Sequence, residues 1–340
     1  MPPRRAARRA ARRACAGVVL LLAFPAAAAA QTPPPTPTPT PTPPPAPPPA
    51  KGTLFLKAQK VHRDGARRIA LTGETWRVRG LVRPFVPGQE IVVTFERNGR
   101  KVHQQIERPQ PSRDGRSGVF LSQFRSRSAG RIVVRAVHRQ TPQLETLRSK
   151  RVRVDVLRPT VGSSGPLVRL LQRGLARLHY AVPRSGVYDD GTARAVMAWR
   201  KVTGQARTFT ATGALLRSVL AGRGTFRIRY PKDGRHVEAD LSRQVLALID
   251  RGKVQRIYMM SSGTAATPTV LGRFQVYRKT PGVNAKGMVH SSYFIRGYAI
   301  HGYASVPPYP ASHGCLRVPI PNAWSIYSWV RMGTVVRVYP

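Results

Sequence analysis

Cysteine is scarce in this chain of 340 residues, which contains only Cys15 and Cys315. Cys15 lies inside an N-terminal segment with the features of an export signal, so the mature protein would keep one thiol. A single thiol excludes an internal disulfide. It also excludes a structural zinc site built from paired cysteines, because such sites use four ligands in characteristic spacings.

Acidic residues are also few, with 14 Asp and Glu against 57 Lys and Arg, for a formal net charge of +43. An excess of this size usually indicates a polyanionic partner such as nucleic acid, acidic lipid or an acidic polymer. For an exported protein the natural partner is an anionic cell wall, and we expect no nucleic-acid partner. A basic surface that is only solvated is the alternative.

The chain also lacks a long hydrophobic run. In residues 1–30, six arginines precede an apolar stretch from Val18 to Phe24, and Pro25 and a string of alanines follow. This order is typical of a cleaved signal peptide, and the apolar stretch is short for a membrane-spanning helix. We therefore expect export to the periplasm or the extracellular cell wall, and no transmembrane span after cleavage. An uncleaved anchor is the alternative.

The rest of the sequence divides into four segments. Residues 31–51 are a Pro/Thr-rich linker, which should form an extended polyproline II spacer of roughly 60 Å. Residues 52–158 alternate with period two and contain the hairpin signal Asn98-Gly99, so about seven short strands predict an immunoglobulin-like β-sandwich. Residues 160–222 have the helical period, with Leu167, Leu171 and Leu175 on one face, and predict three helices.

Strand patterns return in residues 224–340, which we expect to form a mostly-β domain with a helix over residues 323–332. The predicted strands cover residues 227–230, 237–241, 245–249 and 254–260. The predicted fold class is therefore multidomain: a β-sandwich, a small three-helix domain and a mostly-β domain.

Cys315 stands near two histidines, His301 and His313. A cysteine with a histidine base is the minimum apparatus for nucleophilic acyl transfer. An imidazolium that lowered the thiol pKa to ~6 would make the thiolate dominant, which corresponds to a differential interaction of about 3.4 kcal/mol. His313 is two residues from Cys315, so an extended strand would place both on one face. His301 must approach from a neighbouring strand.

Two neighbours of Cys315 suit the same chemistry. Gly314 has no Cβ, so a backbone N–H can approach a reacting carbonyl as an oxyanion donor. Arg317 can hold a substrate carboxylate by a two-point contact. A buried structural cysteine is the alternative. Zinc would need His290 as a fourth ligand, and we expect no metal and no cofactor.

Residues 224–340 resemble the L,D-transpeptidase catalytic domain of the YkuD type. The stretches that carry the resemblance are Asp240-Leu241-Ser242-Arg243-Gln244, Ser261-Ser262-Gly263, Thr267-Pro268, Gly272-Arg273-Phe274, Ile300-His301-Gly302-Tyr303 and Ser312-His313-Gly314-Cys315-Leu316-Arg317. The resemblance implies that Cys315 is the nucleophile and His301 the proton donor and acceptor, with the carbonyl of Gly302 orienting its imidazole.

The same resemblance implies roles for the rest of the motif. His313 is expected to shape the pocket, and Arg317 to contact the substrate. Ser312 and Tyr303 are further candidates for substrate binding, beside the oxyanion role expected of Gly314.

Residues 160–222 resemble the peptidoglycan-binding domain type 1. The matching stretches are Gly165-Pro166-Leu167-Val168-Arg169, Leu170-Leu171-Gln172, Leu178-His179-Tyr180, Gly186-Val187-Tyr188 and Thr192-Ala193-Arg194-Ala195-Val196. Together the two resemblances predict a monomeric peptidoglycan L,D-transpeptidase that forms 3→3 cross-links between stem peptides through a Cys315 thioester and releases D-alanine. The alternatives are an L,D-carboxypeptidase, a non-catalytic wall-binding protein and a polyanion binder.

Overall fold

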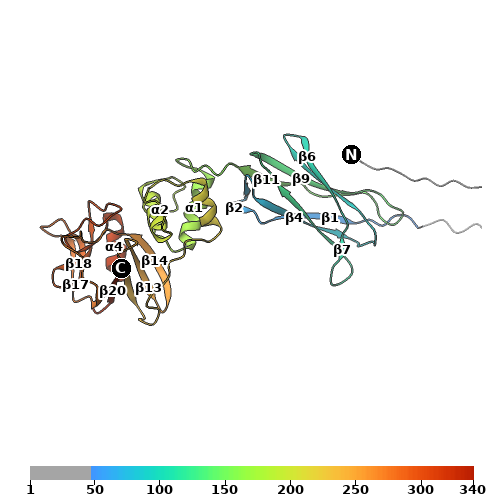
Figure 1. Ribbon diagram of the computed structural model, residues 1–340. Helices are drawn as coiled ribbons and strands as arrows, with labels where there is room; N and C mark the ends of the chain where they lie inside the picture. The colour runs from blue at the N-terminus through green and yellow to red at the C-terminus, as the bar shows by residue number, and fades with distance from the viewer. Residues whose placement is uncertain (1–46) are drawn as a thin grey trace, which may run out of the picture. The chain divides into compact units, whose positions relative to one another are not determined.

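The computed structural model describes residues 47–340, which contain four helices and twenty strands (Figure 1). Residues 48–340 form one compact unit. The predicted export signal and the linker up to residue 46 lie outside the described residues. No helix among residues 47–340 is long and apolar enough to cross a membrane.

Eleven strands fall within residues 53–157 and build two sheets, with the orders β1-β4-β8-β7 and β2-β3-β11-β9-β5-β6, β10 pairing with β9. The sequence predicted about seven strands, because β2, β7 and β10 have only two or three residues and show no alternation. The bounds are β1 Thr53–Gln59, β2 His62–Asp64, β3 Arg67–Leu71, β4 Thr75–Arg83, β5 Ile91–Arg97, β6 Arg100–Glu107, β7 Gln110–Pro111, β8 Gly118–Arg125, β9 Gly130–His138, β10 Leu147–Arg148 and β11 Val152–Leu157.

Alternate side chains of these strands enclose an aromatic core. Trp76 meets Phe95 edge to face, with ring centroids 5.9 Å apart, and Phe95 stacks on Phe124 at 4.7 Å. The predicted hairpin joins β5 to β6, and both Asn98 and Gly99 have positive φ, as a two-residue hairpin turn requires. The hairpin at this position is therefore confirmed.

Three helices follow at the predicted positions: α1 Pro166–Arg177, α2 Asp190–Val202 and α3 Gly213–Leu220. The side chains of Asp189 and Thr212 cap α2 and α3 by accepting backbone N–H bonds. Leu171 and Leu175 are buried in a core that continues into the strand residue Ile257. The apolar faces of the helices therefore pack on the strands that come next.

The last segment contains two further sheets, with the orders β14-β13-β12-β20-β15 and β16-β17-β18-β19. A core that includes Leu246, Phe294 and Ile300 joins residues of both, and α4 packs against β17 and β18. The bounds are β12 His236–Asp240, β13 Val245–Asp250, β14 Lys253–Met259, β15 Gly272–Gln275, β16 Arg278–Val283, β17 Val289–Ile295, β18 Tyr298–Tyr303, β19 Leu316–Pro319, α4 Ile320–Trp329 and β20 Val335–Tyr339.

Two predictions for this segment were wrong. Residues 227–230 are not a strand, because the backbone N–H groups of Arg229 and Tyr230 donate to the buried carboxylate of Glu238, at 3.0 and 2.7 Å. The Glu238 side chain thus accepts the hydrogen bonds that a neighbouring strand would otherwise accept. The last helix covers Ile320–Trp329 rather than residues 323–332, and it begins earlier because proline is tolerated in the first turn of a helix and Pro321 lies there.

Candidate active site

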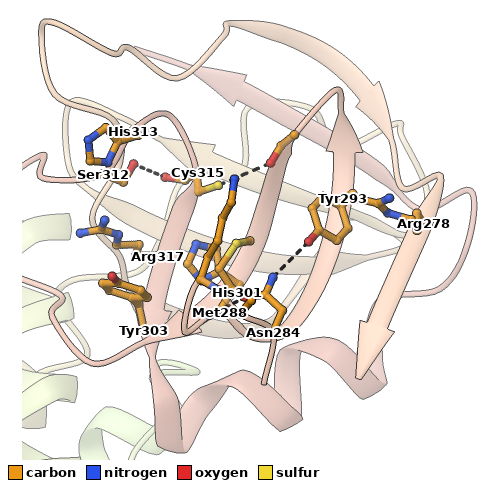
Figure 2. A pocket seen from close by; sticks show the side chains of 13 residues that line it. Arg278, Asn284, Met288, Tyr293, His301, Tyr303, Ser312, His313, Cys315 and Arg317 are labelled. Atoms are coloured by element: carbon orange, nitrogen blue, oxygen red, sulfur yellow. Dashed lines mark hydrogen bonds between the residues drawn. The ribbon is translucent and has the colours of Figure 1, made fainter. Parts of the chain in front are cut away.

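A cavity of about 550 Å³ opens beside Cys315. Figure 2 shows Arg317 and Tyr303 on one side of Cys315, and Tyr293 and Asn284 on the other. Six of the predicted site residues line this cavity: His301, Tyr303, Ser312, His313, Cys315 and Arg317. Gly302 and Gly314 lie in the chain next to lining residues but are not part of the lining.

Parallel pairing of two strands brings the histidine and the cysteine together. Strands β18 and β19 run side by side, with His301 opposite Arg317 and Ile300 opposite Leu316. Cys315 immediately precedes β19, so it stands beside Ala299 near the start of β18, two residues before His301. The prediction that His301 approaches from a neighbouring strand is confirmed.

His301 is held in one tautomer. Its ring is buried, 3% exposed, and Nδ1 lies 2.9 Å from the carbonyl oxygen of Gly302. A carbonyl oxygen can only accept, so Nδ1 carries the proton and Nε2 keeps its lone pair. The ring of Tyr303 stands edge-on to the imidazole at 5.7 Å. The arrangement provides a base at Nε2.

The electrostatics of the site favour two neutral groups. The pKa of His301 is lowered to about 4, mainly by burial. The hydrogen bond to Gly302 raises the pKa in part, and the charge of Arg317 lowers it. Burial also raises the pKa of the Cys315 thiol, although the positive charges of Arg317 and Lys286 oppose this shift. Both shifts run against the thiolate beside an imidazolium that the sequence suggested, because desolvation outweighs the nearby charges.

The loop before Cys315 is closed by its own serine. Ser312, which is buried, donates from its hydroxyl to the carbonyl oxygen of Cys315 at 2.6 Å and accepts from the N–H of Gly314 at 3.1 Å. The geometry gives Ser312 a positioning role, and its substrate contact stays a prediction. The Gly314 amide is likewise occupied and does not point freely at a substrate oxygen.

Gly314 is required here for steric reasons. Its φ is +105°, and a Cβ built on it would lie 1.8 Å from the ring of Tyr298. The segment from His313 to Cys315 is a bend, so the prediction that His313 and Cys315 share a strand face was wrong. His313 is exposed, and Figure 2 shows its ring turned away from the sulfur of Cys315.

The loop rests on a second segment, whose role the sequence did not reveal. The Thr269 hydroxyl donates to the carbonyl oxygen of Gly314 and accepts from the N–H of Gly263, both at 2.9 Å. Thr267 donates from its hydroxyl to the carbonyl oxygen of Ser312 at 3.0 Å. The stretches around Gly263 and Thr267 carry part of the resemblance described above, and this was the only signal for them.

The comparison with known families agrees with this geometry. Residues 234–338 match the family described as YkuD, the L,D-transpeptidase catalytic domain. This chain carries an L,D-transpeptidase catalytic domain.

Several solved structures are similar to the chain. An L,D-transpeptidase from Xylanimonas cellulosilytica is 35% identical over 53% of this chain and 97% of that one, with a TM-score of 0.49. An L,D-transpeptidase from Stackebrandtia nassauensis is 21% identical over 53% and 93%, with a TM-score of 0.35. An L,D-transpeptidase from Mycobacterium smegmatis is 12% identical over 84% and 100%, with a TM-score of 0.29. No curated protein matches the chain.

The far wall of the transpeptidase cavity comes from residues that no motif singled out. These residues lie on β16, on β17 and between them: Arg278, Asn284, Lys286, Met288 and Tyr293. Met288 and Tyr293 pack against Cys315, and the Arg278 guanidinium lies 4.0 Å from the centre of the Tyr293 ring. A hairpin that folds back over the site cannot be inferred from local residue patterns.

Arg317 is fixed on the near wall of the transpeptidase cavity. Its Nη1 donates to the carbonyl oxygen of Ala311 at 3.0 Å, and its guanidinium stacks on the Tyr303 ring at 4.1 Å. A stacked guanidinium loses little freedom when it binds a carboxylate. Among residues 47–340 there is no group of three or more His, Cys, Asp or Glu side chains that could hold a metal ion.

Proposed function

We propose that the protein is a peptidoglycan L,D-transpeptidase that works through a thioester on Cys315. The observation that carries the proposal is the pairing, in one cavity of the catalytic domain, of a thiol with an imidazole whose Nε2 accepts a proton. The proposed substrate is a tetrapeptide stem, cleaved between its third residue and D-alanine.

In the first half-reaction the Cys315 sulfur attacks the carbonyl carbon of the third residue while His301 Nε2 takes the thiol proton. The bond from that carbon to the D-alanine nitrogen then breaks, and His301 returns the proton to the leaving amine. In the second half-reaction an amine from another stem attacks the thioester and gives its proton to His301. The carbon–sulfur bond breaks, and the sulfur regains a proton.

The proposed oxyanion donors shift from Gly314 to its neighbours. The Gly314 N–H is bonded to Ser312, whereas the N–H groups of His313 and Cys315 donate in none of the turn, loop and cap hydrogen bonds of residues 47–340. Each preorganised donor of this kind contributes ~3 kcal/mol of transition-state stabilisation. Arg317 is then left to bind a stem carboxylate.

The other segments are proposed to deliver the catalytic domain to its substrate. Two sheets with a shared aromatic core support an immunoglobulin-like domain over residues 52–158, and the helices α1–α3 support a peptidoglycan-binding domain over residues 160–222. With the catalytic domain at 224–340, the signal at 1–30 and the linker at 31–51, the basic chain would act outside the cell as a monomer on an anionic wall.

Mass spectrometry of muropeptides after incubation with the protein tests this proposal. Transpeptidation predicts 3→3 linked dimers and released D-alanine. Tripeptides without dimers would instead make the protein an L,D-carboxypeptidase. Unchanged muropeptides, together with retention on insoluble peptidoglycan, would favour a non-catalytic wall-binding protein.

A further inference from the structure

A second cavity of about 500 Å³ adjoins the active site. Its walls come from α2, from the loop that carries Phe209, from the end of β18 with the loop that follows it, and from the start of α4. Tyr303 lines both this cavity and the one that holds Cys315. We call the second cavity the Phe209 groove.

The Phe209 groove is apolar and held open. Phe209 is 42% exposed and Ile320 43% exposed, and Val306 adds a third apolar side chain to its lining. The loop of Phe209 is fixed by two bonds: Tyr188 donates to the carbonyl oxygen of Phe209, and Arg200 Nη2 donates to that of Thr210 at 2.8 Å. Because the groove is already formed, little free energy is lost in ordering its loop when a ligand binds.

One contact fixes the spacing of the groove's walls. Arg207, on the same loop, donates from Nη1 to the carbonyl oxygen of Pro308 and from Nη2 to that of Ser242, both at 2.8 Å. These bonds tie the loop to the catalytic domain beside Val306. The groove is therefore a built feature of the chain.

Two charges on α2 line the groove without partners. No ion pair within residues 47–340 includes Asp190 or Arg194, and the Nε of Arg194 is buried with no hydrogen-bond partner. The buried Nε fixes where the side chain lies, and the Nη groups of Arg194, which form no hydrogen bond or ion pair within residues 47–340, are the donors that a ligand acceptor would meet. A guanidinium beside apolar walls suits a carboxylate attached to small aliphatic groups.

We propose that the Phe209 groove binds the acceptor stem peptide, with a stem carboxylate on Arg194 and the aliphatic part of the peptide on Phe209, Val306 and Ile320. This inference rests on the proposed transpeptidase function. Because Tyr303 separates the two cavities, a peptide in the groove can extend past it and bring its amine to the thioester. The helical segment thus contributes directly to the choice of acceptor.

The test compares donor cleavage with transfer in the full chain. The probe is an alanyl-glutamyl-diaminopimelate tripeptide and its C-terminal amide, offered with a tetrapeptide donor. For Arg194→Gln, the acceptor concentration that gives half-maximal transfer should rise about 10- to 100-fold, the loss of one charge-assisted contact. D-Alanine release without acceptor should not change. Arg177→Gln, an exposed arginine of α1, loses the same charge and should change neither quantity.

A double-mutant-type cycle, with the free and the amidated tripeptide on the wild type and on Arg194→Gln, tests whether the C-terminal carboxylate contacts Arg194. If the C-terminal carboxylate meets Arg194, amidation weakens transfer in the wild type and has no further effect in Arg194→Gln. Equal losses in donor cleavage and transfer, or a Phe209→Ala variant with unchanged acceptor dependence, would overturn the groove assignment. So would a wild-type enzyme that binds acceptor only through its sugar portion or through a second copy of the chain.

Failure of the transpeptidase function gives a different result from failure of the groove. A wild type that forms no acyl-enzyme contradicts the proposed function. Binding of the tripeptide to Cys315→Ala, compared with Cys315→Ala/Arg194→Gln by calorimetry, tests the groove without catalysis. Equal affinities in those two proteins would contradict the groove.

Discussion

The Nδ1 of His301 lies 2.9 Å from the carbonyl oxygen of Gly302, the next residue in the chain. This bond fixes the base without any carboxylate, and a carbonyl stabilises an imidazolium less than a carboxylate would. Burial therefore dominates, and the pKa of His301 falls to about 4. In the proposed mechanism the site is a neutral pair that separates charge only during attack.

The pH dependence of acylation should reflect this neutral base. His301 is unprotonated above pH 4, so acylation should be lost as the pH falls through about 4 rather than through the 6.5 of a free histidine. Burst kinetics of donor cleavage between pH 3 and 8 measure this limb.

Replacement of the two histidines separates their roles. His301→Gln should lower acylation by about 10²- to 10⁴-fold, the usual contribution of a general base. His313→Gln, whose side chain is exposed, should lower it far less. A larger loss from His313→Gln would contradict the assignment of the base.

Gly314→Ala should destabilise the protein and abolish acylation. The backbone has φ +105°, and the new methyl carbon would overlap the Tyr298 ring at 1.8 Å, so the loop that carries Cys315 must move. Strain at such a φ alone costs about 1–3 kcal/mol. Chemical unfolding and donor cleavage measure the two effects.

Gly204→Ala is the matched control. Its φ is +67° and nothing lies within 4 Å of the added carbon, so the variant carries backbone strain without overlap. It should cost stability and leave acylation intact. Equal activity losses in the two variants would show that the contact with Tyr298 is irrelevant.

Lys201 should make stability depend on pH. Its Nζ is buried and donates to the carbonyl oxygens of Gln244 and Met260, at 3.1 and 2.8 Å. Burial, aided by the charge of Arg207, lowers its pKa to about 7. An unfolded lysine keeps its proton up to pH ~10.4, so the unfolded state binds more protons between these values.

The free energy of unfolding should therefore rise from pH 7 toward pH 10 through Lys201. Denaturant titrations across that range should show a rise that is smaller in Lys201→Met. Lys253→Met, at an exposed position, is the control and should keep the wild-type rise. A rise of the same size in Lys201→Met would refute a neutral lysine.

Much of this architecture can be predicted from the sequence because it depends on residues that are close together in the chain. The spacing of Leu167, Leu171 and Leu175 predicts α1, and Asn98-Gly99 predicts a hairpin that is present. The strand expected at residues 227–230 does not form, because the carboxylate of Glu238 accepts the backbone N–H groups of Arg229 and Tyr230. Whether a side chain or a neighbouring strand accepts these backbone N–H groups depends on the tertiary structure, which local residue patterns do not show.

The site divides in the same way. The motifs around His301 and Cys315 contain the residues that one strand and one loop bring together. The presence of His301 and Arg317 in the site could therefore be predicted from the sequence. The far wall around Tyr293 and the support from Thr269 depend on how separate hairpins fold over the loop. The raised pKa of the Cys315 thiol results from burial, which spacing does not encode.

Intact-mass spectrometry of the protein with a tetrapeptide donor tests the central claim most directly. The wild type should gain the mass of the donor less D-alanine, with the adduct mapped to Cys315, and Cys315→Ala should show neither adduct nor D-alanine release. Release of D-alanine by Cys315→Ala would contradict the thioester mechanism.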